Sequence, residues 1–219
     1  MNPIARRVLT ALATAAIVVA AILCVPPQAI APAVAGLALL AGAEYAQLLR
    51  RRRPLGPARA VAFLAVGLLV IIGGLSALPL WALRHGPMML LYVIAIVKIS
   101  DMGGFAFGMT SARLLKGGNH KLCPTVSPNK SWEGLFGSVF ASCLVSCLFM
   151  SATQFGWGKA LAFGVTAALV GTAGDLVESR FKRWAGAKDS ATFMPAGLGG
   201  FLDMLDSLLF APAVLLPFA

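Results

Sequence analysis

The stretch AVAFLAVGLLVIIGGLSALPLWAL, residues 60–83, contains no charged residue. It is long enough to cross the hydrocarbon core of a bilayer as a helix, which takes about 20 residues. Strands of a membrane barrel would alternate in polarity over about 10 residues, whereas this stretch is apolar all round. It predicts a membrane-spanning α-helix, because inside a bilayer each backbone polar group must find its partner within a helix or a closed barrel.

Similar apolar runs recur along the 219 residues of the chain, which is 59% hydrophobic and 12% charged, with a mean hydropathy of +0.86. A soluble domain carries about twice that charged fraction. The pattern predicts an all-α, polytopic integral membrane bundle of about seven transmembrane helices. The candidate spans are residues 5–24, 29–49, 60–83, 86–109, 134–153, 158–178 and 200–218.

The first span has an alternative interpretation as a signal peptide, because Arg6 and Arg7 precede its apolar core. The run is longer than a usual signal core and Pro26-Pro27 follows it, so we expect an uncleaved helix. Basic residues set the orientation of membrane helices. Alternate connections hold 15 of the 18 Lys and Arg residues, which predicts a cytoplasmic N-terminus. The net charge of +10 is therefore a topology signal and not evidence for nucleic-acid binding.

The chain has only eight acidic residues, and Asp101, Asp175, Asp203 and Asp206 among them lie within or at the ends of apolar spans. A carboxylate near the middle of a bilayer costs about 2.5–3.5 kcal/mol, so such residues usually face a polar interior and carry function. The alternative is that they lie at the headgroup level, cap helices or pair with Lys98 and loop arginines. The predicted topology places all four on the cytoplasmic side. Together with the basic loops they predict a site for a divalent cation and phosphates.

Two further stretches carry weaker signals. KLCPTVSPNKSWEG, residues 121–134, predicts a turn followed by a helix that Glu133 begins, with Trp132 as an interfacial anchor. SDMGGFAFG, residues 100–108, pairs Asp101 with glycines that would also suit a small-residue packing face.

In combination, these motifs resemble the CDP-diacylglycerol synthase family, also called phosphatidate cytidylyltransferases. The family signature runs S-x-x-K-R-x4-K-D, then P-G-H-G-G, then D-R-x-D. Its first half is matched at full spacing and much of its second half is matched, by Ser179, Lys182, Arg183, Lys188, Asp189, Pro195, Gly199, Gly200, Asp203 and Asp206. Gly174-Asp175, Ser100-Asp101 and residues 127–134 (SPNKSWEG) also resemble family elements. The chain departs from the family in lacking the motif histidine and arginine.

The resemblance implies transfer of a cytidylyl group from CTP to phosphatidate, giving CDP-diacylglycerol and pyrophosphate. By this analogy Asp175 and Asp203 are metal ligands for Mg²⁺, with a second cation as an option. The expected catalytic residues are Lys182, Arg183, Lys188, Asp189 and Asp206, and the expected substrate-binding residues are Ser179, Asp101, Ser127, Lys130, Gly199 and Gly200. Residues 1–85 would form N-terminal transmembrane helices and residues 86–219 the catalytic region of one continuous membrane domain.

The expected location is the bacterial inner membrane, among membrane lipids, with the active site facing the cytoplasm and a homodimer as an option. Three alternatives stay open. The first is a non-catalytic paralogue that acts as a membrane scaffold or lipid-binding protein, which the lost histidine and arginine favour. The second is a cation transporter, which would predict mid-membrane acids and inverted repeats. The third is a related transferase with a different lipid phosphate acceptor or nucleotide.

Overall fold

The computed structural model describes residues 15–51, 56–115, 118–187, 190 and 200–219. Helices dominate these residues, which confirms the all-α membrane-protein prediction. The helices are α2 (Pro27–Arg51), α3 (Pro57–His85), α4 (Pro87–Leu114), α5 (Trp132–Leu148), α6 (Met150–Thr153), α7 (Trp157–Trp184), α8 (Phe201–Leu205) and α9 (Ala211–Leu215). Two 3₁₀ turns, η1 (Ser207–Leu209) and η2 (Leu216–Phe218), flank α9, and strands β1 (Lys121–Cys123) and β2 (Ser127–Ser131) form a small hairpin.

Each predicted span coincides with helical structure, but the helices differ in length. Four of them, α2, α3, α4 and α7, are long and apolar enough to cross a bilayer. Shorter apolar helices cover 15–24, 132–148 and 207–218. The first span is described only from residue 15, and the basic pair at 6–7 lies outside the described residues.

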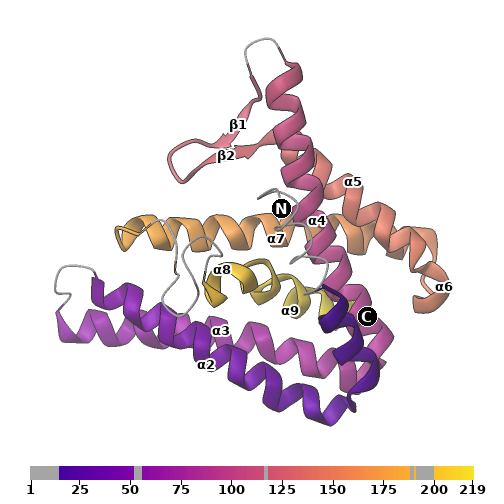
Figure 1. Ribbon diagram of the computed structural model, residues 1–219, viewed down its shortest axis with the longest axis horizontal. Coiled ribbons are helices and arrows are strands. Elements are labelled where there is room, and N and C mark those ends of the chain that lie inside the picture. The colour runs from indigo at the N-terminus through magenta and orange to yellow at the C-terminus, as the bar shows by residue number, and fades with distance from the viewer. Residues whose placement is uncertain (1–14, 52–55, 116–117, 188–189, 191–199) are drawn as a thin grey trace, which may run out of the picture.

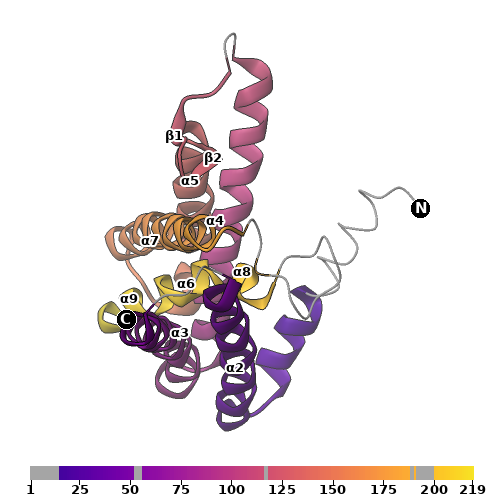
Figure 2. The same ribbon diagram turned by 90° about the vertical axis from the view of Figure 1, so that its left-hand side faces the viewer.

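The long helices form two groups with the C-terminal segment between them (Figure 1). Helices α2 and α3 lie side by side, while α4 crosses α7 steeply in both views (Figure 2). The segment α8–η1–α9 packs against α2 and α3 on one side and against α7 on the other. The C-terminal segment is therefore enclosed by helices from both halves of the chain.

Small residues allow α4 and α5 to approach closely. A Cβ atom on Gly103 would lie 2.6 Å from the carbonyl oxygen of Gly137, and one on Gly137 would lie 2.7 Å from the carbonyl oxygen of Gly103. Both distances are shorter than a van der Waals contact, so only glycine fits at either position. The glycines that follow Asp101 thus form the small-residue packing face that the sequence allowed as an alternative.

Replacing Gly137 by alanine is expected to destabilise the protein by about 1–3 kcal/mol, because the new methyl group forces α4 and α5 apart. The measurement is thermal unfolding in detergent. Gly73→Ala in α3 is the matched control, since a Cβ there meets nothing within 4 Å. Equal unfolding temperatures for the two variants would contradict the close approach.

Buried hydroxyl groups connect α4, α5 and α7. The hydroxyls of Tyr92 and Ser146 lie 2.6 Å apart, and Ser146 donates to the carbonyl oxygen of Ala160 at 2.6 Å. Ser142 donates to the carbonyl oxygen of Gly164 at 2.8 Å. In an apolar environment such bonds give helix pairs a defined register.

The stretch before α5 forms an antiparallel hairpin, which the sequence predicted only as a turn. Ser131 ends β2 and caps α5, because its side chain accepts the N–H of Gly134 at 3.1 Å. The Glu133 carboxylate accepts the backbone N–H of His120 at 3.2 Å and lies 2.7 Å from its Nδ1 atom. Glu133 begins the helix as expected and also holds the chain that enters the hairpin.

The C-terminal span is broken and is not one regular helix. α8 ends at Leu205, and the Asp206 carboxylate accepts the N–H of the next residue, Ser207, at 2.5 Å. Pro212 and Pro217 lack the N–H that a continuous helix needs. Asp206 itself keeps helical backbone angles, so the direction of its side chain follows from that of α8.

Candidate functional site

One face of α7 carries four polar side chains in the C-terminal third of the helix. Asp175, Glu178, Ser179 and Lys182 are spaced by three, four and seven residues, so they lie on the same side over two turns. Ser179 donates to Asp175 Oδ1 at 3.3 Å. Glu178 is buried, with 6% of its surface exposed. This face points toward the C-terminal segment.

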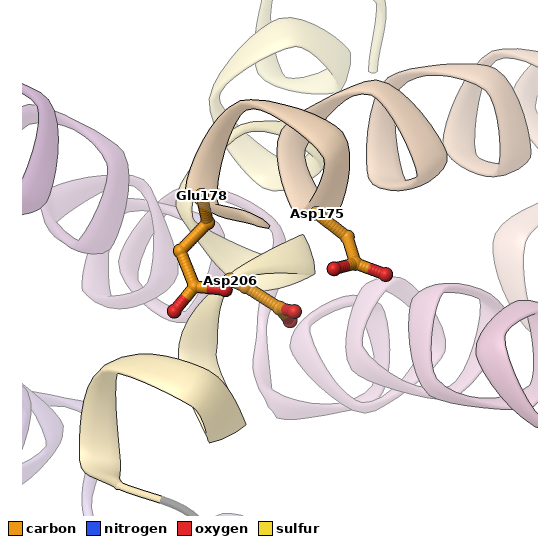
Figure 3. Close-up of side chains that lie close together, drawn as sticks. All are labelled: Asp175, Glu178 and Asp206. Atoms are coloured by element: carbon orange, nitrogen blue, oxygen red, sulfur yellow. The ribbon is translucent and has the colours of Figure 1, made fainter. Parts of the chain in front are cut away.

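Three carboxylates from α7 and the break after α8 meet at this face. One oxygen atom from each of Asp175, Glu178 and Asp206 lies within 4.8 Å of the others (Figure 3). At that distance two like charges repel by about 3–4 kcal/mol with an effective dielectric constant of 20. Positive charge beside the three-acid group lowers this repulsion.

Two lysines supply part of that charge from different elements. Lys130 of β2 places Nζ 2.5 Å from Asp175 Oδ2. Lys182 places Nζ 2.7 Å from Glu178 Oε2 and 2.8 Å from Asp203 Oδ1, and its side chain is only 12% exposed. The hairpin and the C-terminal segment are thus both attached to α7 through ion pairs.

Asp203 is surrounded by donors. Besides Lys182, its carboxylate accepts the backbone N–H of Gly200 at 2.9 Å and that of Ser190 at 3.1 Å. The bond to Gly200 is the return contact from the third helical residue to the helix start, which stabilises a first turn. Asp203 lies beside the three-acid group and holds the start of α8.

A second connection joins α4 to the same segment. Lys98 donates to the carbonyl oxygen of Met204 at 2.8 Å and to Ser207 Oγ at 3.0 Å. Ser207 in turn donates to Asp101 Oδ2 at 2.8 Å, and Lys98 lies 3.7 Å from the same oxygen. The carbonyl group that the helix break leaves without an in-helix partner is therefore satisfied by Lys98.

A cavity of about 520 Å³ opens between α4, the hairpin, α7 and the C-terminal segment. Its size falls within the usual range for small-molecule sites, about 300–1,000 Å³. Six of the residues that the sequence analysis selected line it together: Asp101, Ser127, Lys130, Asp175, Asp203 and Asp206.

The three-acid group of Asp175, Glu178 and Asp206 fits a divalent cation. Mg²⁺ prefers carboxylate oxygens, and Glu178 Oε1 is buried with no hydrogen-bond partner among the described residues. If all are ionised, the five carboxylates of the cavity wall and the three-acid group exceed the ammonium groups of the three lysines paired with them by two charges, which one divalent cation balances. These side chains are Asp101, Asp175, Glu178, Asp203 and Asp206, and Lys98, Lys130 and Lys182.

The other predicted site residues do not line the cavity or lie outside the residues that the structure describes. Arg183 is exposed, and in the described part of the chain no ion pair joins it to these carboxylates. Gly200 begins α8 and contacts Asp203 through its N–H group. Lys188, Asp189 and Gly199 fall outside the described residues.

Sequence reasoning missed Glu178 and Glu44. Glu178 follows Asp175 by three residues on a predicted helix, so its spacing was the signal that could have identified it. Glu44 is an acidic residue inside an apolar span and is fully buried. Its contacts join α2 to α8, a pairing of elements that the sequence does not reveal.

The fold and the site define a helical membrane protein with a polar, cation-compatible cavity lined by carboxylates and lysines. The sequence model of the Cytidylyltransferase family matches residues 56–218. The chain belongs to this family.

Curated relatives agree with that assignment. The chain is 42% identical over 123 residues to proteins named phosphatidate cytidylyltransferase from Staphylococcus aureus (strain COL), Staphylococcus haemolyticus and Staphylococcus epidermidis. The match covers 55% of this chain and 45% of each relative. The matched stretch is thus less than half the length of these relatives.

Proposed function

We propose that the protein transfers a cytidylyl group from CTP to phosphatidate, forming CDP-diacylglycerol and releasing pyrophosphate. The observation that carries this proposal is the three-acid group, within 4.8 Å and beside two lysines, on a cavity of about 520 Å³ in a membrane protein. The family assignment and the names of the relatives support the choice of CTP and phosphatidate. Carboxylates and lysines are the groups that cation-bound phosphates require.

The chemistry needs no side-chain nucleophile. A phosphate oxygen of phosphatidate attacks the α-phosphorus of CTP, a new P–O bond forms, and the bond to the β-phosphate oxygen breaks with its electron pair. Bringing two anions together is the main barrier, so positioning and charge neutralisation carry the catalysis. When bound, Mg²⁺ would neutralise charge on the phosphate oxygens. Asp175, Glu178 and Asp206 would hold it, with a second cation as an option.

The other residues have roles that follow from their contacts. Lys130 lines the cavity and is partly exposed, so it is suited to bind a substrate phosphate in exchange for its contact with Asp175. Lys182 holds Glu178 and Asp203 in place. Ser179 orients Asp175 through its hydrogen bond.

Further residues complete the proposed site. Asp101 and Ser127 contribute to the cavity wall where substrate binds. Arg183 and Lys188 would interact with the leaving pyrophosphate, and Asp189 would orient these basic side chains. Gly199 and Gly200 would allow substrate to approach the backbone. The proposed reaction has CTP and phosphatidate as substrates and involves no nucleic acid. The proposed location is the bacterial inner membrane with the cavity open to the cytoplasm, and a homodimer is compatible with it.

The direct test uses the full chain in membranes or detergent with labelled CTP, phosphatidate and Mg²⁺. We expect labelled CDP-lipid and pyrophosphate in equal amounts, and loss of both products when a chelator removes divalent cations. Omitting phosphatidate is the control for CTP hydrolysis.

Each other outcome contradicts a definite part of the proposal. Absence of labelled lipid, under conditions where a Staphylococcus relative is active, would favour a scaffold or lipid-binding role. Transfer to another lipid phosphate would retain the reaction and replace the acceptor. Full activity in chelator would remove the three-acid group from the mechanism.

A further inference from the structure

Glu44 of α2 lies outside the part of the chain that the family model matches, yet it contacts the start of α8. Its side chain is fully buried. The Oε2 atom accepts the backbone N–H of Leu202 at 2.9 Å and the hydroxyl of Ser190 at 3.3 Å. A buried carboxylate in an apolar helix is costly, and such residues usually have a specific partner and role.

Glu44 and Asp203 hold the same turn by different groups. Asp203 accepts the N–H groups of Ser190 and Gly200, while Glu44 accepts the N–H group of Leu202 and the hydroxyl group of Ser190. The free N–H groups at a helix start therefore meet two carboxylates from separate elements. One of these carboxylates belongs to the cavity wall and the other does not.

The backbone at Gly200 is shaped to admit Glu44. A Cβ atom at Gly200 would lie 2.5 Å from Glu44 Oε2 and 2.9 Å from its carboxyl carbon. The contact thus depends on a missing side chain. It also gives Gly200 a reason to be glycine that is independent of any substrate.

The position of Asp206 in the three-acid group depends on the first turn of α8. α8 is only five residues long, and Asp206 follows its last residue directly. A short helix has little stability of its own, so its direction depends on what holds its ends. Lys98 holds the C-terminal side through the carbonyl oxygen of Met204, and Glu44 holds the N-terminal side.

We infer that Glu44 is a positioning residue for the cation site: by holding the first turn of α8, it places Asp206 against Asp175 and Glu178. The inference rests on the proposed function for its catalytic consequence, but its structural part stands without it. Glu44 touches neither substrate nor cation. It acts through the backbone, as outer partners of metal ligands do.

The test compares Glu44→Leu with Glu44→Gln in the full chain. Leucine fills similar space without an acceptor, whereas glutamine keeps a carbonyl oxygen for Leu202 and Ser190. For Glu44→Leu we expect the Mg²⁺ concentration giving half-maximal activity to rise about 10–100-fold. For Glu44→Gln we expect a value within about threefold of the unchanged protein, since the bonds are retained.

Tyr45→Phe is the matched control. Tyr45 is the next residue of α2, is similarly buried, and donates to the carbonyl oxygen of Phe63 at 2.8 Å, which joins α2 to α3. Its loss should lower the unfolding temperature and leave the Mg²⁺ requirement unchanged. If Glu44→Leu behaves in the same way, Glu44 only stabilises the fold and the inference is overturned.

Two measurements keep the inference separate from the proposed activity. Amide hydrogen exchange over residues 200–207 should increase in Glu44→Leu and stay unchanged in Tyr45→Phe. Binding of Mn²⁺ as a probe should weaken about 10–100-fold in Glu44→Leu. Unchanged exchange and Mn²⁺ binding would refute the role of Glu44 even in an active enzyme. If the unchanged protein forms no CDP-lipid, the proposed function fails, and these two measurements still decide the inference.

If Glu44→Leu does not fold, Glu44→Asp provides the same comparison. Its carboxylate is one methylene shorter and falls short of the Leu202 N–H from the same backbone position. The expected direction of each change is the same, and a wild-type Mg²⁺ requirement in a folded Glu44→Asp protein would refute the inference.

Discussion

Asp206→Asn is expected to lower cytidylyl transfer by about 10³-fold, equivalent to about 4 kcal/mol of transition-state stabilisation. The substitution removes one negative charge from the three-acid group. It keeps the shape of the side chain and an oxygen that can still accept the N–H of Ser207. The backbone break after α8 is therefore preserved, and the loss reports on cation binding. The measurement is the rate of CDP-lipid formation as a function of Mg²⁺ concentration, together with Mn²⁺ affinity.

Asp101→Asn provides the matched comparison. Asp101 lines the same cavity and also contacts Ser207, but it lies outside the three-acid group. We expect this variant to retain Mn²⁺ binding and to lose mainly affinity for substrate. If both variants bind Mn²⁺ as the unchanged protein does, the cation is held elsewhere.

Lys182→Met is the second change with a large expected effect. Lys182 is nearly buried and pairs with both Glu178 and Asp203. Removing one partner of a buried ion pair leaves an uncompensated charge and costs about 3–5 kcal/mol. We expect a much lower unfolding temperature in detergent and loss of activity.

A double variant separates stability from catalysis. Adding Glu178→Gln to Lys182→Met removes one of the two carboxylate charges that Lys182 compensates and should recover part of the lost stability, without recovering activity. The family resemblance implies that Lys182 is a catalytic residue, which as a cation would contact the phosphates of CTP. A Lys182→Met protein that stays stable and shows only a raised KM for CTP would favour that assignment over the structural role.

Most of the fold could be predicted from the sequence, because apolar runs such as residues 60–83 leave helices as the only available solution in a bilayer. The hairpin at 121–131 was harder to predict. Its strands are short and polar, and it is held by contacts of His120 with Glu133 and of Trp132 with the His120 carbonyl oxygen. Its pairing depends on these contacts and not on a periodic pattern.

The site could be predicted as a set of residues but not as a geometry. A continuous helix through residues 200–218 puts Asp203 and Asp206 on one face, and the resemblance pairs Asp203 with Asp175 at the metal. The structure brings Asp206, and not Asp203, into the three-acid group with Asp175. Asp203 forms an ion pair with Lys182 and accepts backbone N–H groups, while Asp206 lies close to Asp175 and Glu178. Whether Asp203 also reaches a cation stays a prediction.

The enclosure of the C-terminal segment has a consequence for biosynthesis. Residues 200–219 leave the ribosome after α2, α3 and α7, yet they pack between those helices. N-terminal parts of a chain generally fold first during synthesis. Helices α2, α3 and α7 must therefore first associate loosely enough for residues 200–219 to pack between them. The wall of the cavity is then completed only after residues 200–206 have been made, and a nascent chain stopped before residue 200 would insert into the bilayer without a complete cavity.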